Sequence, residues 1–249
     1  MAVEFLTAKV VENKQWNDRL HSLRVDADFP DFKAGQFARL ALDIDGELIA
    51  RPFSLVNAPY EKLLDFYLIE IPDGVLSPRL AAMKPGDEIK IAPKAAGLLT
   101  LDQIPAAKHL YLISTGTGLG PFLSIIKTDE VWQQFEKVVL VHGVRFANEL
   151  TYQELIADVK QQHNEQFEYL PFVSREKTDE AIEGRVTKAI KDGFFEERTG
   201  LTFSAEDSHV MLCGNPDMVQ EMMDILITDH GLQKHSKREP GQISIEKYW

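Results

Sequence analysis

The segment Thr115-Gly-Thr-Gly-Leu-Gly-Pro121 has the residue types that most clearly predict ligand chemistry in this sequence. Its three glycines let the backbone approach a ligand closely, because no side chain intervenes. The apolar run His109–Ser114 precedes it at strand length, and apolar residues at helical spacing follow it. Pro121 suits the first turn of a helix, where its missing amide costs nothing. Free amides at a helix start favour an anion, most often a phosphate.

The spacing of this segment departs from the dinucleotide fingerprint G-x-G-x-x-G, because Pro121 stands where the last glycine would be. No acidic residue that would hold a ribose hydroxyl is evident. The next strand-like run, Val138–His142, leads instead to Gly143-Val-Arg145. An arginine there suits a 2′-phosphate and favours NADP over NAD. Taken alone, the segment could also be a plain strand-to-helix turn.

Three other segments offer ligand chemistry. Arg51-Pro-Phe-Ser54 combines a charge, a ring and a hydroxyl that could address one ligand, or it could be a surface strand. Gly74-Val-Leu-Ser77 predicts a second phosphate cradle, with Ser77 as N-cap of a short helix over residues 77–83, or a plain turn. Cys213-Gly-Asn-Pro216 predicts a strand end and a helix start, although Cys213 could equally be a small buried apolar residue.

The elements that must position these segments fall into two regions. Residues 1–101 contain short β-rich runs separated by turns, which predicts a small antiparallel β-barrel. Asp45-Gly46 predicts a hairpin turn. The expected strands are Glu4–Val11, Leu20–Val25, Leu40–Ile44, Glu47–Ala50, Ser54–Asn57, Asp65–Glu70 and Glu88–Ala92.

Residues 107–249 alternate strand and helix patterns, which predicts an α/β domain with a parallel sheet covered on both faces. A linker is expected near Leu101–Lys108. The expected strands are His109–Ser114, Val138–Val144, Phe167–Val173 and His209–Cys213. The expected helices are Pro121–Lys127, Tyr152–Gln162, Arg185–Lys191 and Pro216–His230, the last capped by Asn215.

Composition narrows the function classes. The 249 residues suffice for two domains, and the apolar content of 44% is that of a globular protein. A single cysteine excludes a disulfide framework or a cysteine-ligated cluster within this chain, and the histidines show no metal-ligand spacing. We find neither a secretory signal nor a membrane-length apolar run, so a cytoplasmic protein is expected.

The net charge of −12 argues against nucleic-acid binding. Lys234-His-Ser-Lys-Arg238 is nevertheless locally basic. It could be a solvated helix end, or Lys234, Lys237 and Arg238 could form a docking face for an acidic partner.

A resemblance emerges once the motifs are taken together. Arg51–Ser54, Gly74–Ser77, Thr115–Pro121 and Cys213–Pro216 occur in the order seen in ferredoxin–NADP reductases. With the ending Tyr248-Trp249, the chain closely resembles the bacterial ferredoxin/flavodoxin–NADP reductases over nearly its whole length. The resemblance implies an FAD-binding antiparallel β-barrel at residues 1–101 and an NADP-binding α/β domain at residues 107–249.

The resemblance also implies roles for residues of the first domain. Arg51 would pair with the FAD pyrophosphate, Phe53 would stack on the isoalloxazine where relatives commonly have tyrosine, and Ser54 would hydrogen-bond near flavin N5. Val75, Leu76 and Ser77 would offer amides to the phosphates, and Trp249 would stack on the adenine. The remaining implied FAD-site residues are Pro52, Tyr67, Leu68, Ile69 and Tyr248.

For the second domain, the resemblance implies an NADP(H) site along the strand ends. Thr115–Pro121, with Gly116, Thr117 and Gly118, would receive the pyrophosphate, and Thr117 would also lie near the flavin. The residues implied around the 2′-phosphate are Arg145, Ser174, Arg175 and Arg185, and Val144 is a further implied cofactor-binding residue. Cys213, Gly214, Asn215 and Pro216 would border the nicotinamide. Ser54 and Cys213 would act at the hydride step as positioning residues rather than nucleophiles.

The predicted activity is hydride transfer between NADP(H) and FAD, coupled to one-electron exchange with ferredoxin or flavodoxin. A monomer without membrane or nucleic-acid partners is expected. Two alternatives stay open at this point. One is an NADPH-dependent flavin reductase or oxygenase reductase component, and the other is a non-catalytic flavin-binding adaptor.

Overall fold

The computed structural model describes residues 4–247 of the chain. Tyr248 and Trp249, which the resemblance places at the FAD site, lie outside the described residues. The chain forms two compact units. The first runs to Thr100 and includes Gly120–Lys127, and the second comprises Leu101–Leu119 and the chain from Thr128 onward. Each unit is built around one sheet of six strands.

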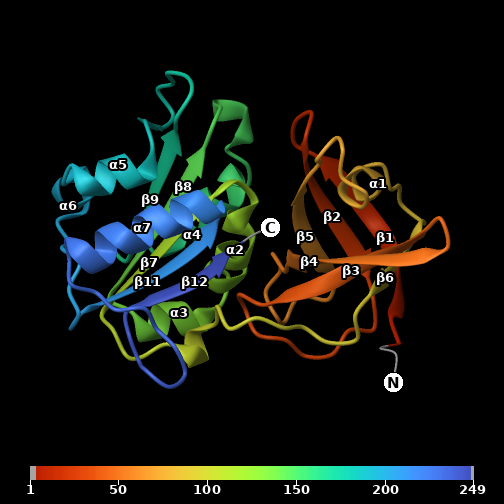
Figure 1. The fold of residues 1–249 in the computed structure, drawn as a ribbon, viewed down its shortest axis with the longest axis horizontal. Coiled ribbons are helices and arrows are strands. Elements are labelled where there is room, and N and C mark those ends of the chain that lie inside the picture. Colours follow the sequence, from red (N-terminus) through yellow and green to blue (C-terminus); the bar gives the residue numbers. More distant parts are fainter. Residues whose placement is uncertain (1–3, 248–249) are drawn as a thin grey trace. The chain divides into compact units, whose positions relative to one another are not determined.

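The sheet of the first unit is antiparallel, with strand order β4-β3-β6-β1-β2-β5 (Figure 1). Its strands are β1 (Leu6–Gln15), β2 (Leu20–Asp26), β3 (Phe37–Ile44), β4 (Glu47–Ser54), β5 (Leu64–Ile69) and β6 (Glu88–Ile91). The two outer strands meet just beyond β4, where Leu55 bridges Phe66 and the Val56 amide donates to Asp65 O at 2.8 Å. The predicted antiparallel barrel is therefore confirmed.

Sequence patterns explain the local form of this sheet. Asp45 and Gly46 have φ values of 52° and 86°, as a two-residue hairpin turn between β3 and β4 requires. The interior is filled by alternating strand residues such as Leu23, Leu40 and Phe66, each fully buried. The separate strand expected at Ser54–Asn57 is wrong, because β4 already extends to Ser54.

Helices α1 (Ser77–Ala81) and α2 (Gly120–Ile126) complete the first unit. Although α2 follows the strand His109–Thr115 directly, its contacts tie it to this unit. Ser124 Oγ donates to Asn57 O at 2.7 Å, and Lys127 Nζ lies 2.5 Å from Glu61 Oε2. The glycine-rich segment therefore begins in one unit and ends in the other.

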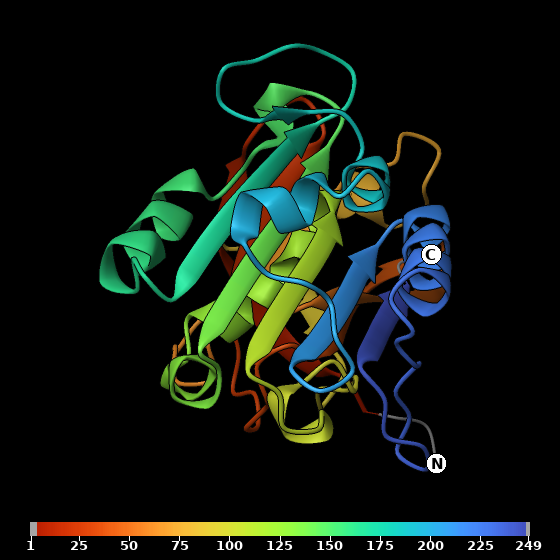
Figure 2. The same cartoon turned by 90° about the vertical axis from the view of Figure 1, so that its left-hand side faces the viewer.

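The second unit holds a parallel sheet, with strand order β10-β9-β8-β7-β11-β12 (Figures 1 and 2). Its strands are β7 (His109–Thr115), β8 (Lys137–Val144), β9 (Phe167–Val173), β10 (Ile182–Glu183), β11 (Ser208–Gly214) and β12 (Ile243–Lys247). The four central strands agree with the sequence-based prediction. The two edge strands, β10 and β12, were not expected.

Helices cover both faces of the parallel sheet, as predicted (Figure 2). They are α3 (Asp129–Gln134), α4 (Gln153–Gln162), α5 (Val186–Lys191), α6 (Phe194–Thr199) and α7 (Pro216–Thr228), with short 3-10 turns η1 (Leu101–Gln103), η2 (Gly116–Leu119) and η3 (Ala147–Glu149). Asn215 caps α7 by accepting from the amides of Asp217 and Met218 at 2.8 and 3.2 Å, which confirms the predicted cap. Met222 of α7 is fully buried in the core.

Within residues 4–247, no helix has the length and apolar character that crossing a membrane would require. The same residues contain no group of histidine, cysteine or acidic side chains that could hold a metal ion.

Candidate functional site

The carboxyl edge of the parallel sheet gathers most residues predicted for the second domain. Thr115 at the end of β7 pairs with Gly143 of β8, and Val144 pairs with Val173 of β9. Cys213 of β11 lies beside Ser114. Because parallel strands end at the same side, the turns that follow them are neighbours. The predicted residues brought to this edge are Gly116, Thr117, Gly118, Val144, Arg145, Ser174, Arg175, Cys213, Gly214, Asn215 and Pro216.

The glycine-rich turn after β7 packs backbone to backbone against the end of β11. A Cβ built on Gly118 would lie 2.5 Å from Cys213 O and 2.8 Å from Gly214 Cα, so only glycine allows this approach. The Asn215 amide donates to Thr115 Oγ1 at 3.0 Å and links the two strand ends. Gly116 has a φ of 54° and open space where a side chain would stand.

The turn also presents backbone donors. It is the short 3-10 turn η2 (Gly116–Leu119), and it leads directly into α2 (Gly120–Ile126). Amides at the start of a strand-to-helix turn favour an anion. The structure therefore fits the phosphate chemistry predicted for this segment.

His142 holds the glycine-rich turn by a hydrogen bond, a role that sequence reasoning missed. Its side chain is fully buried on β8, and its Nε2 lies 3.1 Å from the carbonyl oxygen of Gly116. Burial lowers the pKa of His142 to about 4, so the ring is neutral at pH 7 and its Nε2–H donates to that carbonyl. A histidine at the end of the apolar run Val138–Val141 was the available signal.

Three predicted arginines follow neighbouring strands. Beyond the strand ends, the Ser174 amide donates to Val144 O at 3.1 Å, and the Arg175 amide donates to Arg145 O at 2.9 Å. The two loops are thus paired side by side. On the other side of β9, the Gly184 amide donates to Val173 O at 2.8 Å, directly before Arg185 at the start of α5.

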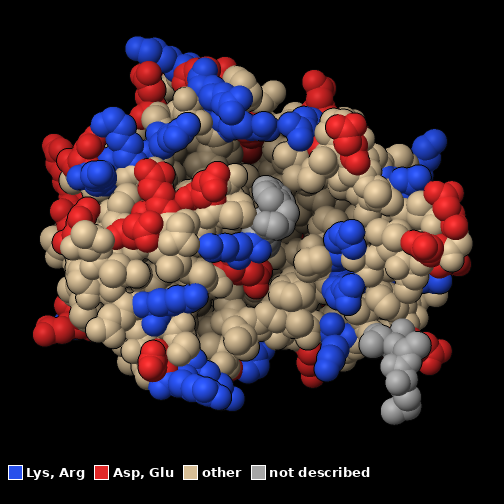
Figure 3. Space-filling view, in the orientation of Figure 1, with Lys and Arg blue, Asp and Glu red and all other residues tan. Residues whose placement is uncertain are grey.

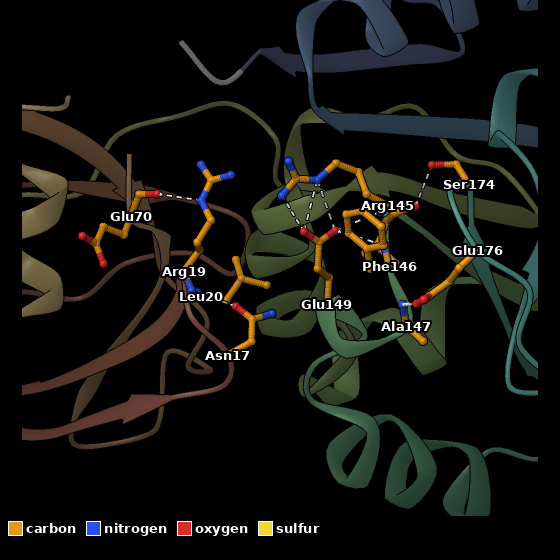
Figure 4. A network of polar contacts seen from close by, with 11 residues as sticks. Asn17, Arg19, Leu20, Glu70, Arg145, Phe146, Ala147, Glu149, Ser174 and Glu176 are labelled. Carbon is orange, nitrogen blue, oxygen red and sulfur yellow. Dashed lines mark hydrogen bonds and ion pairs between the residues drawn. The ribbon is translucent and has the colours of Figure 1, made fainter. Parts of the chain in front are cut away.

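The three arginines differ in whether a described acidic residue pairs with them. Arg175 and Arg185 are exposed, and in the described part of the chain neither forms an ion pair. Arg145 instead pairs with Glu149, its Nη2 and Nε lying 2.5 and 3.1 Å from Glu149 Oε1 (Figure 4). Although burial alone would raise the pKa of Glu149, its hydrogen bonds to Arg145 lower that pKa below its ordinary value. Both partners are therefore charged at pH 7.

Cys213 is fully buried one residue before the end of β11. Its neighbour across the β11–β12 ladder is Glu246, which sequence reasoning did not single out. Glu246 Oε1 is buried and has no hydrogen-bond partner among the described residues. Burial raises the pKa of Glu246 to about 7. A buried carboxyl with a raised pKa thus lies beside the strand end that carries Cys213.

In the first unit, the segment Arg51–Ser54 lies at the end of β4. Arg51 is exposed and donates through Nη1 to Ala50 O at 2.9 Å, Pro52 is exposed, and Phe53 is half-buried. Side chains alternate along a strand, so Arg51 and Phe53 share one face while Ser54, only 3% exposed, lies on the other. The sequence-based expectation that the Arg51 charge and the Ser54 hydroxyl address one ligand stays a prediction, with the two side chains on opposite faces of the strand.

Ser54 meets β5 at the start of α2. A Cβ built on Gly120 would lie 3.7 Å from Ser54 Cβ and 3.9 Å from Tyr67 Cβ, so these three residues surround one point within the first unit. Tyr67 and Leu68 of β5 are buried, and Ile69 is half-buried. The structure thus brings Ser54 and Tyr67 together.

The turn before α1 forms the second predicted cradle. The prediction that Ser77 caps the helix is wrong by one residue, since Leu76 holds the N-cap position and α1 ends at Ala81. Ser77 Oγ instead accepts from the Ile71 amide at 3.1 Å, which closes the turn. Among the described residues, none accepts a hydrogen bond from the amides of Val75, Leu76 or Ser77. These donors fit a phosphate.

Comparison with known proteins identifies the family. Residues 112–224 match the model of the oxidoreductase NAD-binding domain. The chain is 42% identical over 246 residues to the flavodoxin/ferredoxin–NADP reductase of Escherichia coli, covering 99% of both chains. It is 41% identical to the protein of that name from Buchnera aphidicola, covering 98% of this chain and 99% of the other. The chain belongs to the flavodoxin/ferredoxin–NADP reductase family.

A solved structure from the same family agrees with this assignment. The ferredoxin–NADP⁺ reductase of Neisseria gonorrhoeae, crystallised with bound FAD and NADP, matches with a TM-score of 0.92. It is 32% identical and is covered over 99% of both chains. The two-sheet architecture of a reductase of this family is therefore established for the chain.

The basic segment Lys234–Arg238 of this reductase is a loop between α7 and β12 rather than a helix end. Lys234, Lys237 and Arg238 are exposed there, and the Ser236 amide donates to Glu239 O at 2.9 Å. Acidic and basic side chains are interspersed over the face shown in Figure 3.

Proposed function

We propose that this chain is an FAD-dependent flavodoxin/ferredoxin–NADP reductase that exchanges electrons between NADP(H) and ferredoxin or flavodoxin. Family membership over the whole chain supports the activity. The observation that carries the cofactor choice is that Arg175 and Arg185, which form no ion pair within residues 4–247, lie at the same edge of the parallel sheet as the glycine-rich turn. FAD, when bound, supplies the step between two-electron and one-electron chemistry.

The first unit would hold FAD. The amides of Val75, Leu76 and Ser77 supply neutral donors for its phosphates, and Arg51 supplies a charge. Phe53 and Tyr67 provide aromatic surface for the ring system, with Pro52, Leu68 and Ile69 beside them. Ser54 would position the flavin ring by a hydrogen bond.

The second unit would hold NADP(H) along its strand ends. The amides of Gly116, Thr117 and Gly118 would bind the pyrophosphate. A 2′-phosphate is a dianion that needs several charged donors, and Arg175, Arg185 and Ser174 supply them next to Arg145. Gly214, Asn215 and Pro216 would border the nicotinamide, and Cys213 would position it as a small packed side chain rather than as a nucleophile.

The proposal includes the setting in which the enzyme works. Ferredoxin or flavodoxin would accept single electrons, with the exposed loop of Lys234, Lys237 and Arg238 as a docking face. We also propose that the enzyme is a cytoplasmic monomer without nucleic-acid or membrane partners. Comparing oxygen, free flavin and flavodoxin as acceptors separates this activity from that of a general flavin reductase.

The decisive test is cofactor discrimination. Replacing Arg175 by alanine removes charge-assisted hydrogen bonds worth about 1.5–3 kcal/mol, which corresponds to a loss of roughly 10- to 150-fold in kcat/KM for NADPH. Activity with NADH, which lacks the 2′-phosphate, should change far less. Steady-state kinetics and anaerobic bleaching of the flavin absorbance measure both. An unchanged NADPH/NADH ratio in Arg175→Ala and in Arg185→Ala would refute the assignment.

A further inference from the structure

Glu149 holds Arg145 more completely than an ordinary surface ion pair requires. Arg145 Nη2 and Nε both donate to Glu149 Oε1, at 2.5 and 3.1 Å. The backbone amide of the same arginine donates to Glu149 Oε2 at 2.9 Å (Figure 4). The carboxylate therefore fixes the main chain and the side chain of Arg145 together. Its side chain is only 12% exposed, whereas that of Arg145 is 37% exposed.

This geometry leaves a defined part of the guanidinium free. Glu149 engages the edge formed by Nε and Nη2, and no described residue accepts a hydrogen bond from Arg145 Nη1. Arginine presents its donors in a rigid plane, so fixing one edge fixes the direction of the other. The Arg145 backbone carbonyl is also held by the Arg175 amide at 2.9 Å, so the two arginine loops cannot separate freely.

We propose that Glu149 is a positioning residue for recognition of the 2′-phosphate, which holds the guanidinium of Arg145 so that its Nη1 side is presented in a fixed direction. This inference rests on the proposed use of NADP(H). An unrestrained arginine would lose rotamer freedom on binding a phosphate, whereas Arg145 has already lost it in the free protein. Arg175 and Arg185, which lack ion pairs among the described residues, supply the net positive charge.

Electrostatics alone predicts the opposite effect for Glu149. A carboxylate beside the arginines repels a phosphate dianion, so removing its charge should tighten binding. The direction of the change in phosphate affinity in Glu149→Gln therefore decides between the two effects. If positioning dominates, Glu149→Gln weakens binding. Its single amide oxygen cannot take the places of both Oε1, which accepts from the guanidinium, and Oε2, which accepts from the Arg145 backbone amide, so its NH₂ group would face one of these donors.

Glu176 provides a matched control. Its Oε1 accepts from the Ala147 amide, so it also holds the loop after β8 and places a negative charge next to Arg175 (Figure 4). It makes no hydrogen bond to the Arg145 guanidinium. Glu176→Gln thus removes one charge from the same loops while leaving the Arg145–Glu149 pair intact.

The test measures binding of 2′-AMP and 5′-AMP to the FAD-loaded protein by calorimetry. We expect Glu149→Gln to raise the Kd for 2′-AMP about five- to tenfold, the effect of releasing one long side chain. Glu176→Gln should leave that Kd unchanged or lower it. The kcat/KM ratio of NADPH to NADH should fall in Glu149→Gln, mainly through the KM for NADPH.

Testing Glu149→Gln in a protein that already carries Arg145→Ala separates the positioning of Arg145 from a general loss of folding. If Glu149 acts through Arg145, Glu149→Gln should have no further effect on the Kd for 2′-AMP in an Arg145→Ala protein. In the otherwise unaltered protein, the Arg145 Nε–H resonance should exchange slowly with water, and Glu149→Gln should accelerate that exchange. A melting curve confirms that each variant is folded.

The outcomes distinguish this inference from the proposed function. A wild-type protein that binds 2′-AMP no better than 5′-AMP would overturn the proposed cofactor choice. A wild type that prefers 2′-AMP, with Glu149→Gln binding it equally or more tightly, would overturn only the positioning role. An equal loss in Glu149→Gln with and without Arg145 would also contradict it.

Discussion

Replacing Gly118 by alanine tests whether backbone contact fixes the glycine-rich turn. The new Cβ would lie 2.5 Å from Cys213 O, 2.7 Å from Cys213 C and 2.8 Å from Gly214 Cα. Contacts of a real Cβ below 3.0 Å essentially never occur, so the backbone must move by at least about 0.5 Å. No side-chain rotation can relieve the clash, because all three atoms belong to the main chain.

The cost follows from this geometry. Overpacking of a rigid site typically costs about 1–3 kcal/mol. In a protein of this size, each 1 kcal/mol lowers the melting temperature by about 2–4 °C. We therefore expect Gly118→Ala to melt roughly 2–12 °C below the wild type. The same displacement disturbs the amides of residues 116–118, so the KM for NADPH should rise by about tenfold or more for each charge-assisted hydrogen bond lost.

Gly116→Ala is the control for this substitution. Gly116 has a φ of 54° but nothing within 4 Å of its hypothetical Cβ, so alanine there meets only the left-handed backbone cost of about 1 kcal/mol. Thermal unfolding followed by circular dichroism, together with NADPH kinetics, compares the two variants. The reasoning fails if Gly118→Ala melts with the wild type or is no less stable than Gly116→Ala.

Two further predictions concern pH. Burial raises the pKa of Glu246 to about 7, so the folded state favours its protonated form, and the stability this gives is lost as the pH rises from about 4.5 through 7. Glu246→Gln should therefore gain up to about 3 kcal/mol relative to the wild type between pH 5 and pH 8, and parallel melting curves would contradict this. Burial lowers the pKa of His142 to about 4, so stability is complete above pH 6.5 and is lost as the pH falls through 4. Urea unfolding should show the wild type losing more stability than His142→Gln between pH 7.5 and pH 4.5, and an equal loss would exclude the buried neutral ring.

The fold was predictable where the sequence pattern is long and local. The central strands of the parallel sheet are apolar runs between turns, such as Val138–Val144, and periodicity identifies them. The edge strands were missed for a physical reason. β10 has two residues, and β12 follows a polar loop and is held by pairing with the distant β11. No local pattern encodes such a pairing.

The candidate site also divides into residues that a local sequence pattern reveals and residues that only the folded structure reveals. Glycines and arginines at strand ends were found because their chemistry is visible in the sequence. The supporting residues were not, because their roles depend on what lies next to them in the fold. His142 is placed under Gly116, and Glu246 next to Cys213, only after the strands have paired. The role of Glu149 could have been predicted more easily from the sequence, since an arginine and a glutamate four residues apart can form a local ion pair.

The local arrangement of charged side chains at the candidate site also explains how a protein with a net charge of −12 could bind a phosphate dianion. At physiological ionic strength, charges farther away than about 8 Å are largely screened, so the net charge of the chain matters less than the charges within that distance. At the carboxyl edge of the parallel sheet, Glu149 neutralises Arg145 and orients it. No described residue forms an ion pair with Arg175 or Arg185, so their positive charges are not neutralised by a partner there. Attraction and direction are therefore supplied by different arginines, and a variant that removes one should leave the other measurable.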